Sequence, residues 1–170
     1  RLNREARRLS KSHDARVNYA DDDDKEKRMT LQQWLFSIKG RIGRRDFWIW
    51  IAIWLVTMSA LFTLAGSNLL NLQTAAFIIV CLLWPTAAVV VKRLHDRGKS
   101  GLWALLMVLA WMLLAGNWAM LPQVWQWGVG RFVPTLIIVM MLIDLGAFVG
   151  TQGENKFGKE TQDVRWKADA

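Results

Sequence analysis

The sequence predicts an all-α membrane protein, a four-helix transmembrane bundle with a short cytoplasmic interfacial helix before the first span. Three observations support this prediction. Hydrophobic residues make up 53% of the 170 residues. No Asp, Glu, Lys, Arg or His occurs from Phe47 to Val91, and two further apolar runs follow. Basic residues gather at the ends of these runs, whereas a helix in a soluble core would carry a polar stripe along its length.

Residues 1–28 are highly charged and contain few large apolar groups. Such a segment cannot bury enough surface to fold alone, so we expect a disordered tail, with a short helix near its start as the alternative. The run DDDDK at Asp21–Lys25 is typical of an engineered protease-cleavage site, although an acidic run can also be natural. We therefore expect Met29 to be the natural start and the preceding residues to be an extension.

Residues 29–46 predict a short helix beside the membrane. The spacing i, i+3, i+4, i+7 places four apolar side chains on one helical face: Leu31, Trp34, Leu35 and Ile38. Lys39 and Arg41 follow them, which is typical of a helix that lies on the cytoplasmic leaflet. A helix that packs on the bundle would show the same pattern, and both interpretations stay open.

Four apolar stretches are long enough to cross a membrane, which takes about 20 residues. They are residues 47–66, 72–91, 102–122 and 132–150, so the four-span domain covers residues 47–150. Gly116 and Asn117 weaken the third stretch, and Pro134 stands near the start of the fourth, where proline is tolerated. Residues 151–170 form a C-terminal tail.

Lysine and arginine are divided unequally between the two sides of these spans. One side has Arg131 alone. The other side has twelve such residues: Lys39, Arg41, Arg44, Arg45, Lys92, Arg93, Arg97, Lys99, Lys156, Lys159, Arg165 and Lys167. Because cytoplasmic segments carry an excess of lysine and arginine, we expect both termini and the loop between the second and third spans to lie in the cytoplasm.

This topology also explains the formal net charge of +8. Basic residues at the ends of apolar spans meet anionic lipid headgroups, so we expect the lipid bilayer, and not nucleic acid, as the partner. Cys81 lies within an apolar run, and we expect it to be a small buried side chain without a disulfide.

The loop KRLHDRGKSG, Lys92–Gly101, is the strongest candidate for chemistry. A nucleotide-binding P-loop needs glycine five residues before Gly98, where Arg93 stands instead. A metal site at His95 and Asp96 needs further ligands, and the one other histidine lies in the N-terminal tail. We therefore expect no catalytic, cofactor or metal site. The loop is expected to be a tight turn in which Arg93, His95 and Asp96 form a hydrogen-bonded cluster.

Three stretches together resemble a known family. They are FSIKGRIGRRDFW at Phe36–Trp48, KRLHDRGKSGLW at Lys92–Trp103 and GTQGENKFG at Gly150–Gly158. Their order and spacing are similar to those of the small bacterial inner-membrane proteins of the YhaH/YhaI type, which contain domain of unknown function 805. The resemblance covers Met29 to about Lys159. It implies an integral protein of the bacterial inner membrane without established enzymatic activity.

These motifs supply the candidate site, a basic patch on the cytoplasmic face that contacts lipid phosphates or a protein partner. Its residues are Arg41, Arg44, Arg45, Arg93, His95, Asp96 and Glu154. Within the patch we expect Arg93 to pair with Glu154, because both emerge close to the ends of their spans. The protein is thus expected to be a non-enzymatic scaffold, lipid-contacting or regulatory membrane subunit, which assembles with a second copy or with another membrane protein.

Asp144 carries the alternative function, a small oligomeric transporter or channel. A carboxylate within a span is a candidate functional group by default. It stands six residues before Gly150, or about 9 Å from the cytoplasmic end by helical rise. An ion pair with a basic residue, or a position at the membrane interface, therefore stays open as well.

Overall fold

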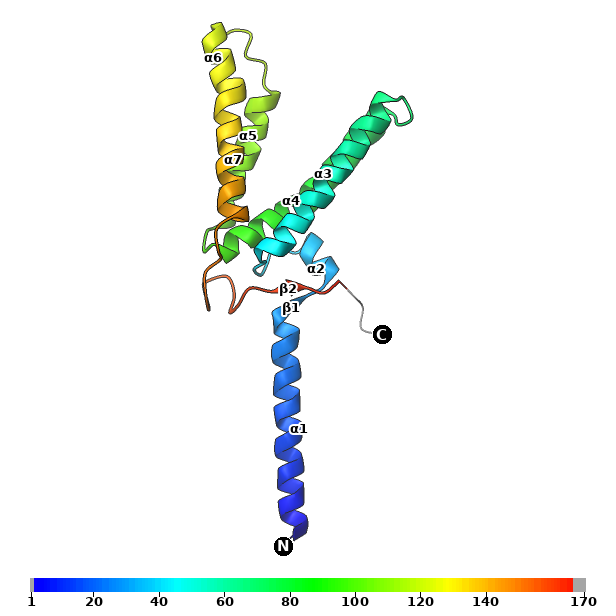
Figure 1. Ribbon diagram of the computed structural model, residues 1–170, viewed down its shortest axis with the longest axis vertical. Coiled ribbons are helices and arrows are strands. Elements are labelled where there is room, and N and C mark those ends of the chain that lie inside the picture. Colours follow the sequence, from blue (N-terminus) through cyan, green and yellow to red (C-terminus); the bar gives the residue numbers. More distant parts are fainter. Residues whose placement is uncertain (1, 167–170) are drawn as a thin grey trace.

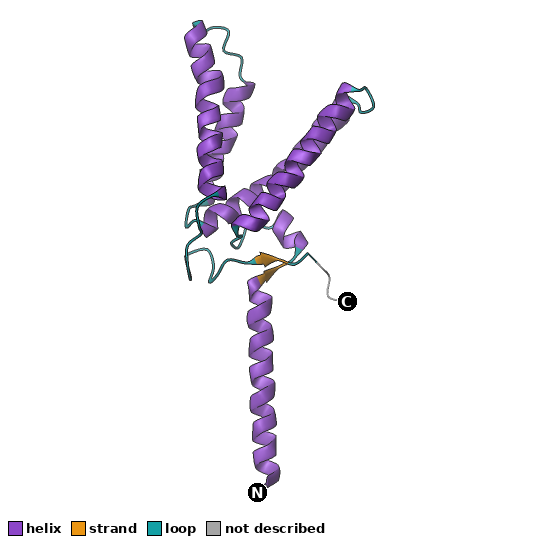
Figure 2. Cartoon of the chain, viewed as in Figure 1, coloured by secondary structure: helices purple, strands orange, loops and turns teal. Residues whose placement is uncertain are grey.

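The computed structural model describes residues 2–166, most of which are helical (Figure 1). The α-helices are α1 (Leu2–Lys27), α2 (Leu31–Phe36), α3 (Arg44–Gly66), α4 (Leu72–Asp96), α5 (Leu105–Ala115), α6 (Gln123–Trp127) and α7 (Val133–Gly146). A 3-10 turn, η1 (Gly101–Ala104), leads into α5, and a π-helical turn, η2 (Gly128–Phe132), joins α6 to α7. Two short parallel strands, β1 (Arg28–Met29) and β2 (Asp163–Val164), complete the fold (Figure 2).

Three helices among the described residues are long and apolar enough to cross a membrane. They are Arg44–Gly66, Leu72–Asp96 and the continuous helix Gln123–Gly146, with 23, 25 and 24 residues. At 1.5 Å per residue each is about 35 Å long, which exceeds the hydrocarbon thickness of about 30 Å. The fourth apolar helix, Gly101–Ala115, is shorter. The composition of these helices is that of a multi-pass membrane protein.

The third span is expected to cover residues 102–122. Its helix ends at Ala115, seven residues before the expected end. Trp118 folds back over the chain there, and its indole N–H donates to the carbonyl of Leu113 at 2.8 Å. A Cβ on Gly116 would come within 2.8 Å of the Trp118 ring. The small residue that weakens the span in the sequence is therefore the one that lets the chain fold back.

The fourth expected span, residues 132–150, is displaced. The helix begins at Gln123, directly after Pro122, and ends at Gly146. Proline suits the start of a helix because the first backbone N–H groups have no intrahelical partner. The glutamines and glycines before Phe132 resemble a loop in composition, yet they form α6 and the π-helical turn.

The helices form two hairpins that diverge from a common base and not a closed four-helix bundle. One hairpin pairs α3 with α4, and the other pairs α5 with the continuous helix of α6, η2 and α7 (Figure 1). We call α2 together with residues 37–43, 92–101 and 147–166 the base. The charged motifs of the sequence all lie in the base or in the first turn of α3.

The main hydrophobic core lies where the hairpins meet the base. Trp34 of α2 is 2% exposed, and its ring packs edge-on against Trp50 at 5.8 Å and against Trp166 at 4.9 Å. The amphipathic helix thus packs on the protein through Trp34. Phe36 and Ile38 of the same segment remain exposed, which leaves membrane contact open for them.

The C-terminal segment closes the base from the side opposite the hairpins. β2 pairs with β1, with Arg28 opposite Asp163 and Met29 opposite Val164. The N–H of Gln162 also donates to the carbonyl of Arg41 at 2.9 Å. Residues 147–166 therefore form part of the base and are not a loose tail.

The N-terminal segment differs from the expected disordered tail, because residues 2–27 form the single helix α1. This helix extends away from the base, on the side opposite the hairpins (Figure 1). It contains neither glycine nor proline, and its many Arg, Lys, Ala, Leu and Glu residues favour a helix. Its described side chains are exposed, as expected for a segment without an apolar face to bury.

Candidate functional site

Asp96, the last residue of α4, lies at the centre of a polar cluster in the base. Its carboxylate accepts hydrogen bonds from the guanidinium groups of Arg41 and Arg93 and from the hydroxyl of Thr161. The distance from Arg41 Nε to Asp96 Oδ1 is 3.2 Å. We call these four residues the Asp96 cluster. It joins three parts of the chain that are far apart in sequence: the segment before α3, the end of α4 and the C-terminal segment.

Arg93 connects α4 to the end of α7. Its Nε donates to the carbonyl of Leu145 and its Nη2 to that of Phe148, both at 2.6 Å, and Nη1 lies 3.4 Å from the carbonyl of Ile42. The last carbonyls of a helix have no intrahelical partner and carry partial negative charge. The buried guanidinium therefore satisfies the end of α7 while it pairs with Asp96.

Arg41 organises the loop that follows the last span. Its Nη1 donates to the carbonyls of Gly153 at 2.6 Å and Gly158 at 3.2 Å, and its Nη2 donates to that of Thr151. Its side chain is 1% exposed. Two buried guanidinium groups thus face one carboxylate, and backbone carbonyls stabilise the positive charge that the carboxylate does not neutralise.

Gly150 allows the loop to approach the cluster. The N–H of Thr151 donates to the backbone carbonyl of Asp96 at 2.7 Å. A Cβ on Gly150 would overlap the Asp96 carboxylate. The glycine of the third motif is therefore required by the close approach of this backbone to the end of α4.

Lys92 and Asp46 are buried charged residues that the sequence-based candidate site omits. Lys92 Nζ donates to the carbonyls of Trp34 at 2.8 Å and of Ser37, which lie at the end of α2. The Asp46 carboxylate accepts from the N–H of Val164 at 3.1 Å and so fixes β2 to the first turn of α3. The sequence could have indicated both residues by their position, since each is the first charged residue next to an apolar run.

His95 lies beside the Asp96 cluster and is not a member of it. Its Nδ1 is 3.3 Å from the carbonyl of Gly40, and its ring stacks on Phe157 with centroids 4.0 Å apart. The side-chain amide of Asn155 donates to the carbonyl of His95 at 2.9 Å. The expected hydrogen-bonded cluster is confirmed for Arg93 and Asp96, whereas His95 positions the loop around residue 157.

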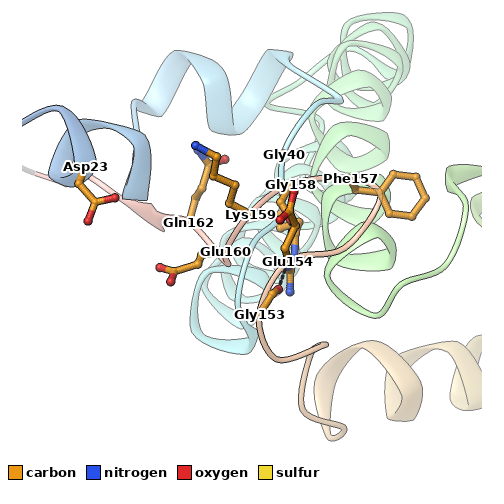
Figure 3. Close-up of a pocket in the computed structure, with 10 residues that line it drawn as sticks. Asp23, Gly40, Gly153, Glu154, Phe157, Gly158, Lys159, Glu160 and Gln162 are labelled. Atoms are coloured by element: carbon orange, nitrogen blue, oxygen red, sulfur yellow. Dashed lines mark hydrogen bonds between the residues drawn. The ribbon is translucent and has the colours of Figure 1, made fainter. Parts of the chain in front are cut away.

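Glu154 does not pair with Arg93, so this expectation is wrong. Glu154 is exposed and lines an open pocket of about 410 Å³, together with Arg41 and Phe157 (Figure 3). The hydrogen bonds of the Arg93 guanidinium go to Asp96 and to backbone carbonyls. Asp96 is closer because it lies one helical turn along α4, where residues three apart share a face.

Arg44 and Arg45 lie on the surface at the start of α3. Arg44 Nη1 donates to the carbonyl of Ala147 at 3.0 Å. The Arg45 side chain is 63% exposed and lies near Asp46 and Asp163, at 3.4 and 3.9 Å. The expected patch is thus divided into a buried part, Arg41, Arg93 and Asp96, and an exposed basic part.

Asp144 is held by two cations from the turn after α4. Arg97 Nη2 lies 3.0 Å from Asp144 Oδ1, and Lys99 Nζ lies 2.9 Å from Oδ2. Asp144 stands two residues before the end of α7, close to the base. The ion-pair interpretation is confirmed, and the carboxylate lies near the end of its helix.

No group of three or more His, Cys, Asp and Glu side chains that could hold a metal ion is present within residues 2–166. Cys81 is exposed on α4, which contradicts the expected buried side chain. Because α4 is one of the apolar helices, the exposed thiol faces the surface that a bilayer would cover. In the described part of the chain, the buried cations of the motifs, Arg41, Lys92 and Arg93, bond to carbonyls and carboxylates of the protein itself.

Comparison with known proteins agrees with the three motifs. The model of the family "Protein of unknown function (DUF805)" matches residues 35–159. The chain is 79% identical over 141 residues to "Uncharacterized protein YiiR" of Escherichia coli strain K12 and, equally, to that of Escherichia coli O157:H7. Each match covers 83% of this chain and 97% of the relative, and no solved structure matches. The chain therefore belongs to the DUF805 family.

Proposed function

We propose that the protein is a non-enzymatic scaffold of the bacterial inner membrane, whose base fixes two helical hairpins at the cytoplasmic surface. One observation carries this proposal: the buried polar side chains of the motifs bond to one another and to backbone groups. Arg41, Arg93 and Asp96 are each about 1% exposed or less. Residues so deeply buried and bonded are suited to holding segments together and not to meeting a substrate.

The distribution of basic residues supports the orientation. The base and the first turn of α3 contain nearly all the lysines and arginines near the apolar helices, and Arg131 alone lies near the opposite ends. Lysine and arginine near the ends of spans favour the cytoplasmic side. The base, with the described parts of both terminal segments, would then lie in the cytoplasm.

The exposed part of the basic patch supports contact with anionic lipid. Arg44 and Arg45 of the patch are exposed, and so is Lys39, which follows the half-exposed apolar side chains of Phe36 and Ile38 in sequence. A basic surface next to exposed apolar side chains is suited to the interface of a membrane with anionic headgroups. A membrane-protein partner with an acidic surface is the second occupant that this chemistry suits.

The surroundings of Asp144 do not favour the transporter alternative. The Asp144 carboxylate forms ion pairs with Arg97 and Lys99, whose nitrogens lie 3.0 and 2.9 Å from its oxygens. A carboxylate neutralised in this way near the end of its helix does not need a transported cation as its partner. We therefore favour the scaffold, and flux in proteoliposomes that disappears on Asp144→Asn would reverse this preference.

The proposal is tested with two triple variants that remove equal charge. One is Lys39→Gln with Arg44→Gln and Arg45→Gln. The control is Arg7→Gln with Lys11→Gln and Arg16→Gln on α1, which extends away from the hairpins. Each protein is purified in gentle detergent from bacterial membranes, and the bound phosphatidylglycerol and co-purifying proteins are measured by mass spectrometry.

Each basic residue near an anionic surface contributes about 1 kcal/mol, so the first variant should lose most of its bound anionic lipid or its partner. The control should retain both, because its cations lie far from the membrane surface. If the wild-type protein carries neither anionic lipid nor a partner, or if both variants lose them equally, the proposed role of the basic surface is wrong.

A further inference from the structure

Arg131 is a cation near the ends of the apolar helices that are opposite to the base. It lies in η2, is exposed, and makes no hydrogen bond or ion pair through its guanidinium among the described residues. The other cations near the apolar helices lie in the base or in the first turn of α3. An ionisable residue within a membrane span is costly unless it finds a partner, and here the protein supplies none.

Two hollows share Arg131 as a lining residue, and they differ in chemistry. One, of about 360 Å³, has a mixed lining in which Asn117, Gln123 and Gln126 supply polar groups. The other, of about 400 Å³, runs along α7 and is lined mainly by apolar side chains, among them Leu136 and Val139. Arg131 and Trp127 line both hollows. A ligand that fills both must therefore have a polar part, an apolar part and an anionic group between them.

The π-helical turn shapes this site. The N–H of Val133 donates to the carbonyl of Gly128, which is the wide hydrogen bond of a π-helix. The buried Gly130 lies against Trp118, so that a Cβ there would come within 2.8 Å of the indole ring. On the exposed side, Trp127 stacks on Phe132 with centroids 5.5 Å apart. The turn thus holds one face against α5 and its following loop and presents Arg131 with two aromatic rings on the other.

The position of Arg131 along its helix is on the side of the hydrocarbon layer that is opposite to the base. It lies fifteen residues from Gly146, or about 22 Å along the helix axis. If the helix end at the base marks one boundary of a hydrocarbon layer about 30 Å thick, Arg131 lies about 8 Å inside the other. An arginine side chain that extends outward carries its guanidinium most of this distance, towards the headgroups.

From these observations we infer that one anionic phospholipid binds at this site, in the leaflet opposite to the base. Its phosphate pairs with the Arg131 guanidinium, a planar group whose paired N–H donors match phosphate oxygens. Its headgroup occupies the polar hollow, and an acyl chain follows Trp127, Phe132, Leu136 and Val139. The inference rests on the membrane insertion proposed above but not on the basic surface of the base.

The test uses the full chain in mild detergent and measures phosphatidylglycerol binding by native mass spectrometry. Arg131→Gln should weaken binding of one lipid molecule by about tenfold or more, since a charged hydrogen bond is lost. Arg131→Lys should fall between this variant and the wild type. Leu136→Trp, which fills the apolar hollow and leaves the cation, should also weaken binding. Arg16→Gln, on the exposed helix α1 away from the hairpins, is the matched control and should leave this molecule bound.

Three results would overturn the site. The first is that Arg131→Gln and the wild type bind phosphatidylglycerol equally. The second is that the wild type binds zwitterionic phosphatidylcholine as well as it binds phosphatidylglycerol. The third is that it binds the glycerophosphoglycerol headgroup without acyl chains as well as it binds phosphatidylglycerol. Extraction of the membranes with alkaline carbonate separates the two proposals. A chain released by carbonate is not inserted, which contradicts the membrane scaffold and the lipid site together. A retained chain with unchanged lipid binding in Arg131→Gln contradicts the lipid site alone.

Discussion

Replacement of Asp96 by asparagine removes the single carboxylate that two buried guanidinium groups share. The Asp96→Asn change keeps the shape of the side chain, but Arg41 and Arg93 would lose their counter-charge while they stay 1% and 0% exposed. Removal of one partner of a buried ion pair costs about 3–5 kcal/mol. For a chain of this size 1 kcal/mol corresponds to about 2–4 °C, so Tm should fall by about 6–20 °C.

Thermal unfolding in detergent, followed by tryptophan fluorescence, measures this loss. The matched control is Asp163→Asn, because the Asp163 side chain is 77% exposed and lies 3.9 Å from Arg45. An exposed pair contributes at most about 1 kcal/mol, so the control should unfold within a few degrees of the wild type. If Asp96→Asn and Asp163→Asn have the same Tm, the Asp96 cluster does not stabilise the base.

Three further changes test the base. Gly150→Ala should cost about 1–3 kcal/mol, because the new methyl group overlaps the Asp96 carboxylate; an unchanged Tm would show that the loop does not approach α4. Lys92→Met should lower the free energy of unfolding by about 1–3 kcal/mol, because the carbonyls at the end of α2 lose their donor, and denaturant unfolding measures it. Arg93→Ala and Glu154→Ala should be additive within about 0.5 kcal/mol, and coupling in this double-mutant cycle would restore the pairing that the structure contradicts.

The long apolar helices could be predicted from the sequence because length and lack of charge are local properties. The limits of the last two apolar helices could not, since they depend on a tertiary contact. Trp118 must lie between Gly116 and Gly130 for the chain to fold back where it does. The sequence shows both glycines but not that one indole ring occupies the space beside them.

The site could be predicted only in part for a similar reason. The spacing of Arg93 and Asp96 on one helical face is visible in the sequence, and their pairing is confirmed. The main acceptors of Arg41 and Lys92 are backbone carbonyls, which every residue has, so no residue type identifies them. Charge alone favours Glu154 as a partner, whereas the fold turns its side chain towards the open pocket.

Arginine-specific labelling of the folded protein tests most directly whether the motif side chains are structural. The wild-type chain in gentle detergent is treated with phenylglyoxal, and each site is followed by mass spectrometry. Arg44 and Arg45 are exposed and should react, whereas Arg41 and Arg93, at 1% and 0% exposed, should stay unmodified until the protein unfolds. Reaction of Arg41 and Arg93 in the folded protein at the rate of Arg45 would show that they are open to a ligand or substrate, and would contradict the scaffold.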